Sequence, residues 1–135
     1  SAASDVYKRQ ILEIGPFASP VYKGKNVKYL DVIDSKSLIL RAKKHSLPIT
    51  NIPKKIHFVG TNLDCVDELF DIVFSSHVIE HQPDIIGHLN SVEKILSESG
   101  RYVMCIPDKR FCFDHNLSES SVADMIDPFI KKNKK

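Results

Sequence analysis

Five short, mainly apolar runs constrain the fold of this 135-residue chain more than any other feature of its sequence. Each run is followed by a glycine, a proline or a polar residue, and helix-like segments or connections separate one run from the next. Strands that alternate with helices or connections in this way favour a parallel sheet built from β-α-β units. We therefore expect strands at residues 11–14, 27–30, 56–59, 70–75 and 102–106.

Three further segments carry apolar residues at the spacing of an α-helix, and Ser35 is a candidate cap at the start of the first. Together with the strands they predict an α/β fold of the Rossmann-like, doubly wound type, with a mostly parallel sheet. Ligands bind such sheets just beyond the carboxyl ends of the strands, near the point where the strand order reverses. The predicted helices cover residues 35–45, 85–96 and 120–132, and the face of the second that we expect to be buried carries Ile85, Leu89, Val92 and Leu96.

The length and composition of the chain suit one globular domain. We expect residues 1–10 to be a non-native lead-in, residues 11–130 to form the domain, and residues 131–135 to be a basic tail. The net charge of +2 depends on the lysines of that tail, which gives no reason to expect a nucleic-acid partner. No apolar run is long enough to span a bilayer, so we expect no membrane insertion and a cytoplasmic location.

The cysteines and two aromatic residues near the carboxyl-terminal end suggest packing rather than chemistry. Cys65, Cys105 and Cys112 form no C-x-x-C pair, which argues against a zinc site or a disulfide framework, and we expect no bound metal. Cys105 lies in an apolar run and is expected in the core. Phe111 and Phe113 are likewise expected to pack against the protein rather than to stack on a ligand.

Two acidic residues and a glycine mark the ends of the first two predicted strands. Gly15 directly follows the first strand, where a residue without a side chain lets a ligand approach the backbone closely. Glu13 lies just before it and can accept a hydrogen bond from an amine or a hydroxyl group. Asp31 ends the second strand, where a carboxylate can bind both hydroxyls of a ribose. The combination favours a ligand that contains a nucleoside.

Four motifs, taken in order, resemble one enzyme family. They read LEIGPFASP, YLD, FDIVFSSHVIEH and SGRYVMCIPD, and the resemblance covers about residues 10–130. In this order and spacing they resemble the class I S-adenosylmethionine-dependent methyltransferases. The segment PDKRFCFD is similar to one in bacterial methyltransferase domains found beside surface-polysaccharide glycosyltransferases. The family normally adds two strands after the fifth, so we expect the sheet of this chain to be incomplete at its carboxyl-terminal end.

The resemblance implies that the cofactor is S-adenosylmethionine and that the chain transfers its methyl group to an acceptor. By the same resemblance, Glu13 and Gly15 would line the methionine end of the cofactor, and Asp31 would hold its ribose. Ser76 and His77 would lie beside the sulfonium and the acceptor. Asn62 and Asp64 would contact the adenine, whereas His81, Asp108, Lys109 and Arg110 would contact the acceptor, which we expect to be a saccharide or another small molecule.

Methyl transfer depends mainly on placing the acceptor in line with the sulfonium, because the methyl group is already activated. A hydroxyl acceptor would also benefit from a base. His77 is the first candidate because it follows the central strand, with His81 and Asp108 as alternatives. Phe17 replaces the family's usual second glycine, which predicts a narrower cradle and weaker cofactor binding. Residues 16–26 leave little room for the usual first helix.

Three other functions stay open. Residues 77–81 also spell H-x-x-E-H, a zinc-peptidase pattern, although Pro83 leaves room for barely more than one helical turn. A nicotinamide-binding domain would need G-x-G-x-x-G, but no glycine follows Gly15 until Gly24. The third alternative is a methyltransferase fold that binds a ligand without catalysis, since a fold does not determine a function.

Overall fold

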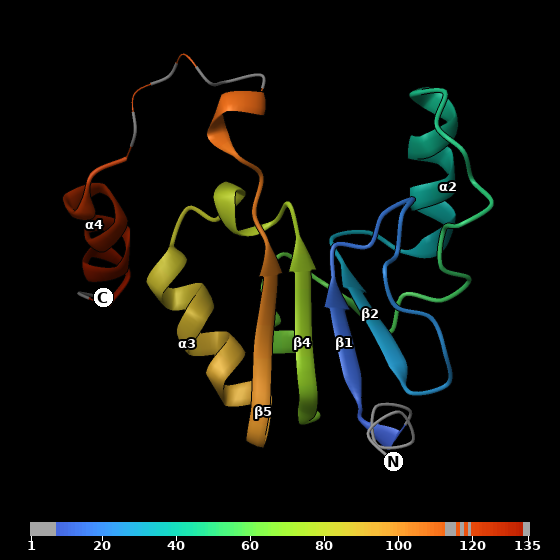
Figure 1. Cartoon of the computed structure of the whole chain (residues 1–135), viewed down its shortest axis with the longest axis horizontal. Coiled ribbons are helices and arrows are strands. Elements are labelled where there is room, and N and C mark those ends of the chain that lie inside the picture. The colour runs from blue at the N-terminus through green and yellow to red at the C-terminus, as the bar shows by residue number, and fades with distance from the viewer. Residues whose placement is uncertain (1–7, 113–115, 117, 119, 134–135) are drawn as a thin grey trace.

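The computed structural model describes residues 8–112, 116, 118 and 120–133. It contains a five-stranded, entirely parallel sheet in the order β3-β2-β1-β4-β5 (Figure 1). The strand order reverses between β1 and β4, so the sheet is doubly wound and the predicted α/β class is confirmed. The strands are β1 (Ile11–Ile14), β2 (Val27–Asp31), β3 (Phe58–Val59), β4 (Phe70–Ser76) and β5 (Leu96–Cys105).

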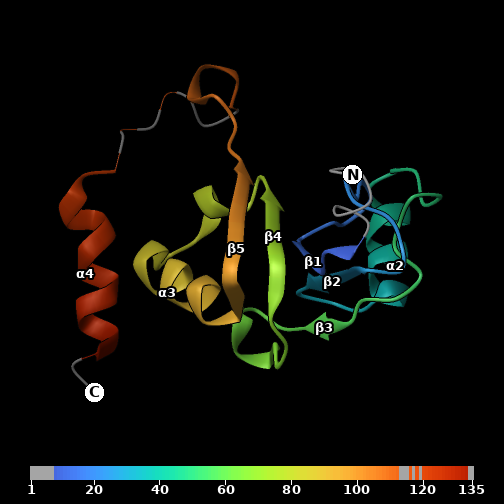
Figure 2. The same ribbon diagram turned by 60° about the horizontal axis from the view of Figure 1, so that its bottom comes forward.

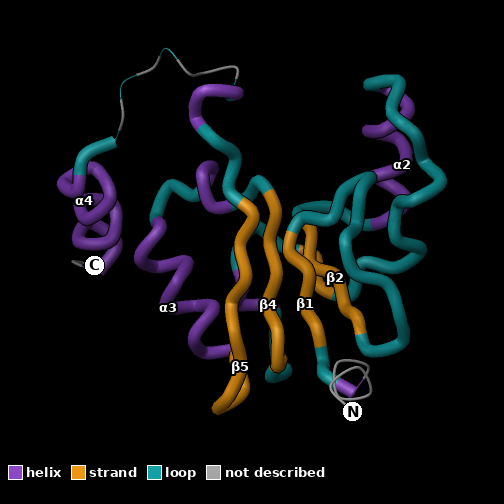
Figure 3. Tube along the Cα trace, in the orientation of Figure 1, coloured by secondary structure: helices purple, strands orange, loops and turns teal. Residues whose placement is uncertain are grey.

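Helices cover both faces of this sheet. Successive residues of a strand point to opposite faces, and in β2 Tyr29 packs with the helix α2 (Ser35–Lys44), whereas Leu30 packs in the cluster beneath α3 (Ile85–Ile95). Figure 3 shows the two helices on either side of the strands. The helix α4 (Val122–Asn133) packs beside α3, on the side away from β1 and β2 (Figures 1 and 2). Three short 3₁₀ helices complete the fold: η1 (Leu63–Cys65), η2 (Ile79–His81) and η3 (Lys109–Phe111).

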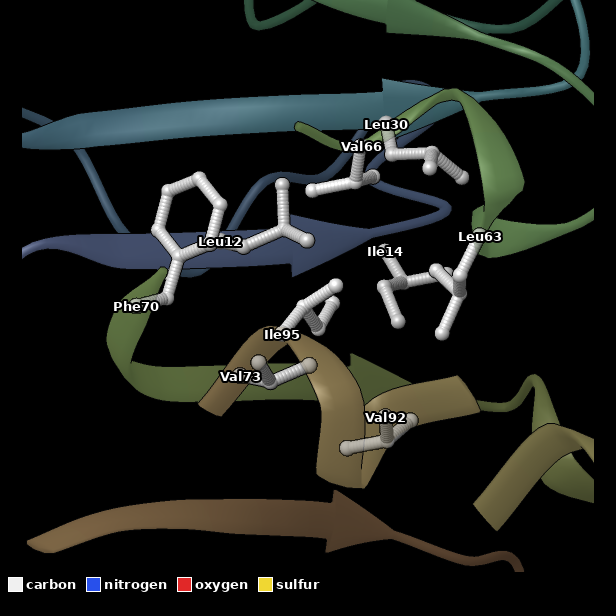
Figure 4. Close-up of a cluster of buried hydrophobic side chains, with 9 residues drawn as sticks. All are labelled: Leu12, Ile14, Leu30, Leu63, Val66, Phe70, Val73, Val92 and Ile95. Carbon is white, nitrogen blue, oxygen red and sulfur yellow. The ribbon is translucent and has the colours of Figure 1, made fainter. Parts of the chain in front are cut away.

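The main hydrophobic core lies between the sheet and α3. Figure 4 shows side chains from β1, β2, β4, α3 and the segment around η1 meeting there. Leu12, Phe70 and Val73 are completely buried, and burying an apolar side chain of this size stabilises the fold by about 1.5–3 kcal/mol. This core fixes the carboxyl ends of β1 and β4 relative to each other. It consists of Leu12, Ile14, Leu30, Leu63, Val66, Phe70, Val73, Val92 and Ile95.

A second, smaller core lies beneath α2. Leu38 and Ala42 of the helix are buried there together with Ile56. The cap of α2 is Asp34 rather than Ser35, because Oδ1 of Asp34 accepts a hydrogen bond from the backbone N–H of Ser37 at 2.8 Å. The hydroxyl of Ser35 instead donates to the carbonyl oxygen of Pro53 at 2.6 Å.

The third and fifth strands differ from their predicted bounds. β3 contains only two residues, since Ile56, which was expected to begin it, packs into the core beneath α2. β5 begins directly after α3, and residues 97–100 bulge out of the ladder between the pairs Phe70–Leu96 and Ile72–Arg101. Gly100 therefore lies in the bulge of β5. A Cβ atom on it would lie 2.9 Å from the carbonyl oxygen of Ser97 and 3.0 Å from that of Phe70.

The exposure of α3 and β5 also differs from the prediction. Val92 is buried as predicted, but Leu89 is exposed and Ile95 is buried, so the buried face is rotated about the helix axis from the predicted one. Cys105 is exposed rather than part of the core. Among the described residues no strand pairs with the outer edge of β5, which leaves that edge open.

The last helix starts at Val122 and includes two lysines of the predicted tail, Lys131 and Lys132. No helix in the described part of the chain is long and apolar enough to cross a membrane.

Candidate functional site

The turn after β1 has a backbone shape that glycine adopts most easily. Gly15 has a φ angle of +66°, in the left-handed region, and its N–H donates to the carbonyl oxygen of Leu30 at 2.8 Å. A Cβ atom on Gly15 would lie 3.1 Å from Cγ2 of Val78, which is tight. A side chain at this position would therefore be strained and crowded. Gly15 itself is half-buried at the end of β1.

Phe17 keeps the backbone conformation of a glycine although it carries a large side chain. Its φ angle is +39°, and its N–H donates to Oδ2 of Asp31 at 3.2 Å. Its ring packs against the core beneath α2, and this contact compensates for the strained backbone. We predicted only that Phe17 narrows the cradle for the cofactor, and that prediction did not include this packing role of the ring. The predicted weakening of cofactor binding stays a prediction.

Asp31 ends β2 beside this turn and is 7% exposed. Its Oδ1 accepts a hydrogen bond from the backbone N–H of Val32 at 2.7 Å, and its Oδ2 accepts the one from Phe17. Burial raises the pKa of this carboxyl group, and the two N–H donors oppose that shift. Each oxygen accepts one bond from the protein, which leaves lone pairs for a ligand hydroxyl.

Glu13 is 2% exposed and closes the loop that follows the turn. Its Oε1 accepts from the N–H of Val21 at 2.8 Å and its Oε2 accepts from the N–H of Tyr22 at 2.9 Å. Burial raises the pKa of Glu13, with these two donors acting in the opposite direction. The loop contains no helix, as its length predicted. In this structure Glu13 positions the loop, and its expected contact with the cofactor stays a prediction.

The end of β4 carries a histidine in an unusual conformation. His77 has a φ angle of +55°, and its N–H donates to the carbonyl oxygen of Cys105 at 3.0 Å, which ties the ends of β4 and β5 together. Ser76 is the last residue of β4. The imidazole of His77 is exposed, with Nδ1 3.6 Å from Oε1 of Glu80, and Nε2 of His81 lies 3.9 Å from the same oxygen. The H-x-x-E-H segment thus lies on a strand end and a 3₁₀ turn rather than on the helix a zinc peptidase would need.

A pocket with polar walls opens between η1 and the start of α3. Its walls include Asn62 and Asp64, the two residues predicted to contact adenine, and Oδ1 of Asn62 caps η1 by accepting from the N–H of Asp64 at 3.0 Å. Asp84, which caps α3, and His88 of α3 also line the pocket, and sequence reasoning did not single them out. Asp84 precedes Gly87 at the spacing of a helix cap, and this spacing could have identified Asp84 from the sequence.

The predicted acceptor-binding cluster lies beyond the end of β5. Arg110 donates to Asp108 through Nε at 3.0 Å and through Nη2 at 2.6 Å, and this pairing lowers the pKa of Asp108. Figure 1 shows η3, which contains Lys109, at the same edge of the sheet as η2. Phe111 is 86% exposed, so the expectation that it packs against the protein was wrong. Phe113 lies outside the described residues.

A family model described as "Methyltransferase domain" matches residues 15–104, about two thirds of the chain. The match begins at the glycine turn and ends inside β5. The chain belongs to the methyltransferase domain family. No curated protein matches the sequence.

Within this methyltransferase domain, the structure brings the predicted residues together in two groups. Gly15 and Asp31 lie side by side, because the β1–β2 register pairs Ile14 with Leu30, the residues directly before them. Asn62 and Asp64 share the pocket beside α3. Glu13 is buried in β1. The remaining predicted residues end or follow β4 and β5 and are exposed or half-buried: Ser76, His77, His81, Asp108, Lys109 and Arg110.

Proposed function

We propose that this methyltransferase domain binds S-adenosylmethionine across the carboxyl ends of β1 and β2 and transfers its methyl group to a small-molecule acceptor. The observation that carries the proposal is the pairing of a left-handed glycine turn with a buried carboxylate at adjacent strand ends. This is the edge where doubly wound sheets bind nucleotides, next to the reversal in strand order.

The residues at this edge fit the chemistry of the cofactor. Asp31 has lone pairs on both oxygens for the two ribose hydroxyls, and Gly15 presents a backbone without a side chain at the neighbouring strand end. Glu13 holds residues 16–22 in place, so the cradle exists before a ligand arrives. Preorganisation of this kind lowers the entropic cost of binding.

The cofactor supplies an activated methyl group, and the chain mainly has to orient the acceptor. His77 follows β4, which adjoins β1 at the reversal in strand order, and presents an exposed imidazole, so it would take the proton from an acceptor hydroxyl. The exposed pair of Asp108 and Arg110 offers both acceptors and donors to the hydroxyls of an acceptor. Lys109 lies between them in the sequence, and His81 lies on η2 at the same edge of the sheet. A saccharide is the acceptor class we favour, and we expect the reaction to take place in the cytoplasm.

Isothermal titration of S-adenosylhomocysteine into the chain tests the proposal. We expect the parent to bind and Asp31→Ala to bind at least about tenfold more weakly, because the hydrogen bonds of a charged group to the ribose are lost. Asp67→Ala removes an exposed carboxylate and serves as the matched control, with affinity unchanged. If a folded parent does not bind the ligand, the proposal is wrong and a non-catalytic binding module becomes the better account.

A further inference from the structure

The helix α4 carries an apolar face that the fold leaves largely uncovered. Its apolar side chains recur at helical spacing, so they gather on one face of the helix. None of the side chains of α4 is buried, and those of Val122 and Ile130 are 66% and 43% exposed. Exposed apolar surfaces that gather on one element mark interaction sites. We call this set the apolar face of α4: Val122, Met125, Ile126, Phe129 and Ile130.

The contact of α4 with α3 covers only part of this face. The two helices pack side by side, and Nζ of Lys132 lies 3.9 Å from Oδ2 of Asp84 at the start of α3. Phe129 is half-buried, whereas Met125 and Ile126 stay exposed. Figures 1 and 2 show α4 at the outside of the molecule, with no other helix or strand of the described chain beyond it. The apolar face therefore has room for a partner.

The acidic residues of α4 lie away from the apolar face. Asp124, Asp127 and Lys131 follow one another at intervals of three and four residues, which places them together on the opposite face of the helix. Nζ of Lys131 pairs with Oδ2 of Asp127 at 2.5 Å. Neither carboxylate would therefore meet a partner that binds the apolar face.

Lysines border the apolar face at its carboxyl-terminal end. Lys132 follows Phe129 by three residues and Met125 by seven, so it lies beside that face, and its side chain is 74% exposed. Lys134 and Lys135 follow in the sequence, so that residues 122–135 contain four lysines and two aspartates. A lysine in this position can lay its apolar stem along an apolar surface and keep its ammonium group in water.

An anionic phospholipid surface fits both the apolar face and the lysines. An amphipathic helix of this kind lies in the plane of the membrane interface, with its apolar side at the boundary of headgroups and acyl chains. Negatively charged headgroups attract the lysines beside it. With 12 residues, α4 is too short to span a bilayer, which takes about 20. The helix would therefore lie on the membrane and not cross it.

We propose that α4 docks the domain on an anionic lipid surface through its apolar face, with Lys132 and the lysines after it at the lipid phosphates. The inference goes beyond the proposed methyl transfer and does not depend on it. The cytoplasmic leaflet of a membrane carries negative charge of this kind, so docking there agrees with the location we expect for the reaction.

Co-sedimentation of the whole chain with lipid vesicles tests the proposal. The vesicles contain phosphatidylcholine alone, or phosphatidylcholine and phosphatidylserine in equal parts. The parent should bind the anionic vesicles at least about tenfold more tightly than the neutral ones, because the lysines meet a charged surface only there. Added salt should weaken this binding, since it screens exposed charges.

Two matched pairs of variants locate the contact on α4. Ile130→Glu should weaken binding to anionic vesicles at least about tenfold, because it places a negative charge on the apolar face. Leu40→Glu makes the same change at an exposed position of α2 and should bind like the parent. Lys132→Gln should weaken binding about fivefold, whereas Lys43→Gln in the last turn of α2 should leave it unchanged.

The other outcomes overturn the proposal. A parent that binds neither vesicle, or binds both equally, does not dock on anionic lipid. Undiminished binding by an Ile130→Glu variant that melts at the temperature of the parent would assign docking to another surface. If that variant does not fold, undiminished binding by Lys132→Gln contradicts the proposal instead. A parent that ignores vesicles but forms a dimer, which Ile130→Glu dissociates, would assign the apolar face to a second copy of the chain.

Discussion

Glu13 and Asp31, at the ends of β1 and β2, are buried and bonded to backbone N–H groups. Asp108 and Arg110, beyond the end of β5, are exposed and bonded mainly to each other. We call residues 11–45, where we propose that the cofactor binds, the cofactor side, and residues 96–112, where we propose that the acceptor binds, the acceptor side. The cofactor side is built before any ligand arrives, since its polar groups are fixed by the fold. The acceptor side is open, because no described strand covers the outer edge of β5.

The largest contrast concerns two phenylalanines that differ only in their surroundings. Phe70→Ala should lower the free energy of unfolding by about 3–5 kcal/mol, because the ring is completely buried in the core that carries the cofactor side. Phe111→Ala, on the acceptor side, should leave it unchanged, since that ring is exposed. Urea denaturation of both variants measures the contrast. Equal losses in the two variants would mean that the acceptor side is as well packed as the core.

The second contrast concerns carboxylates. Glu13→Ala should cost about 2–3 kcal/mol, because it leaves the N–H groups of Val21 and Tyr22 without a charged partner. Asp108→Ala, whose carboxylate is exposed, is the matched variant and should shift the urea midpoint much less than Glu13→Ala, because exposed ion pairs contribute little to stability. Unchanged stability in Glu13→Ala would show that the loop holds itself without this residue.

The pH dependence should have opposite signs on the two sides. The folded-state pKa of Glu13 lies above its ordinary value of 4.5, so the folded state binds the extra proton and stability falls as pH rises through that window. The deficit of Glu13→Gln relative to the parent should therefore shrink from pH 4.5 to pH 7. The pKa of Asp108 is lowered, so its contribution is lost as pH falls below 3.8. Denaturation curves across this range check both signs, and a Glu13→Gln deficit that grows with pH would contradict the burial of that carboxyl group.

The smallest effect concerns His77, at the boundary between the two sides. Its left-handed backbone strains any residue that has a side chain. His77→Gly should therefore be more stable than His77→Ala by about 1 kcal/mol, although both lack the imidazole. Thermal unfolding of the two variants provides the comparison. A less stable glycine variant would place the residue outside the left-handed region.

Much of the cofactor side could be predicted because its determinants are local in the sequence. Gly15 follows one apolar run and Asp31 ends the next. These two local patterns identify both residues as site candidates without information from the rest of the chain. The two backbone bonds of Glu13 could not be predicted in the same way. They depend on how the loop folds back over the sheet, and no pattern of residue types encodes that path.

The acceptor side was predicted less well for a related reason. Cys105 and Phe111 are of residue types that usually lie in a protein core, but their exposure depends on what lies across the edge of β5. Asp84 and His88 were missed because helical periodicity assigns polar residues to solvent, whereas η1 encloses these two in a pocket. In both cases the exposure of the side chain depends on which segments, far apart in the sequence, lie against it.

The central claim is that the cofactor binds where the fold has already built its site. Nitrogen-15 NMR spectra recorded during a titration with S-adenosylhomocysteine test this claim most directly. The account predicts the largest shifts at the amides of Gly15, Phe17 and Val32, with those of residues 109–111 unchanged. Saturable binding that shifts residues 109–111 and leaves these three amides in place would contradict it.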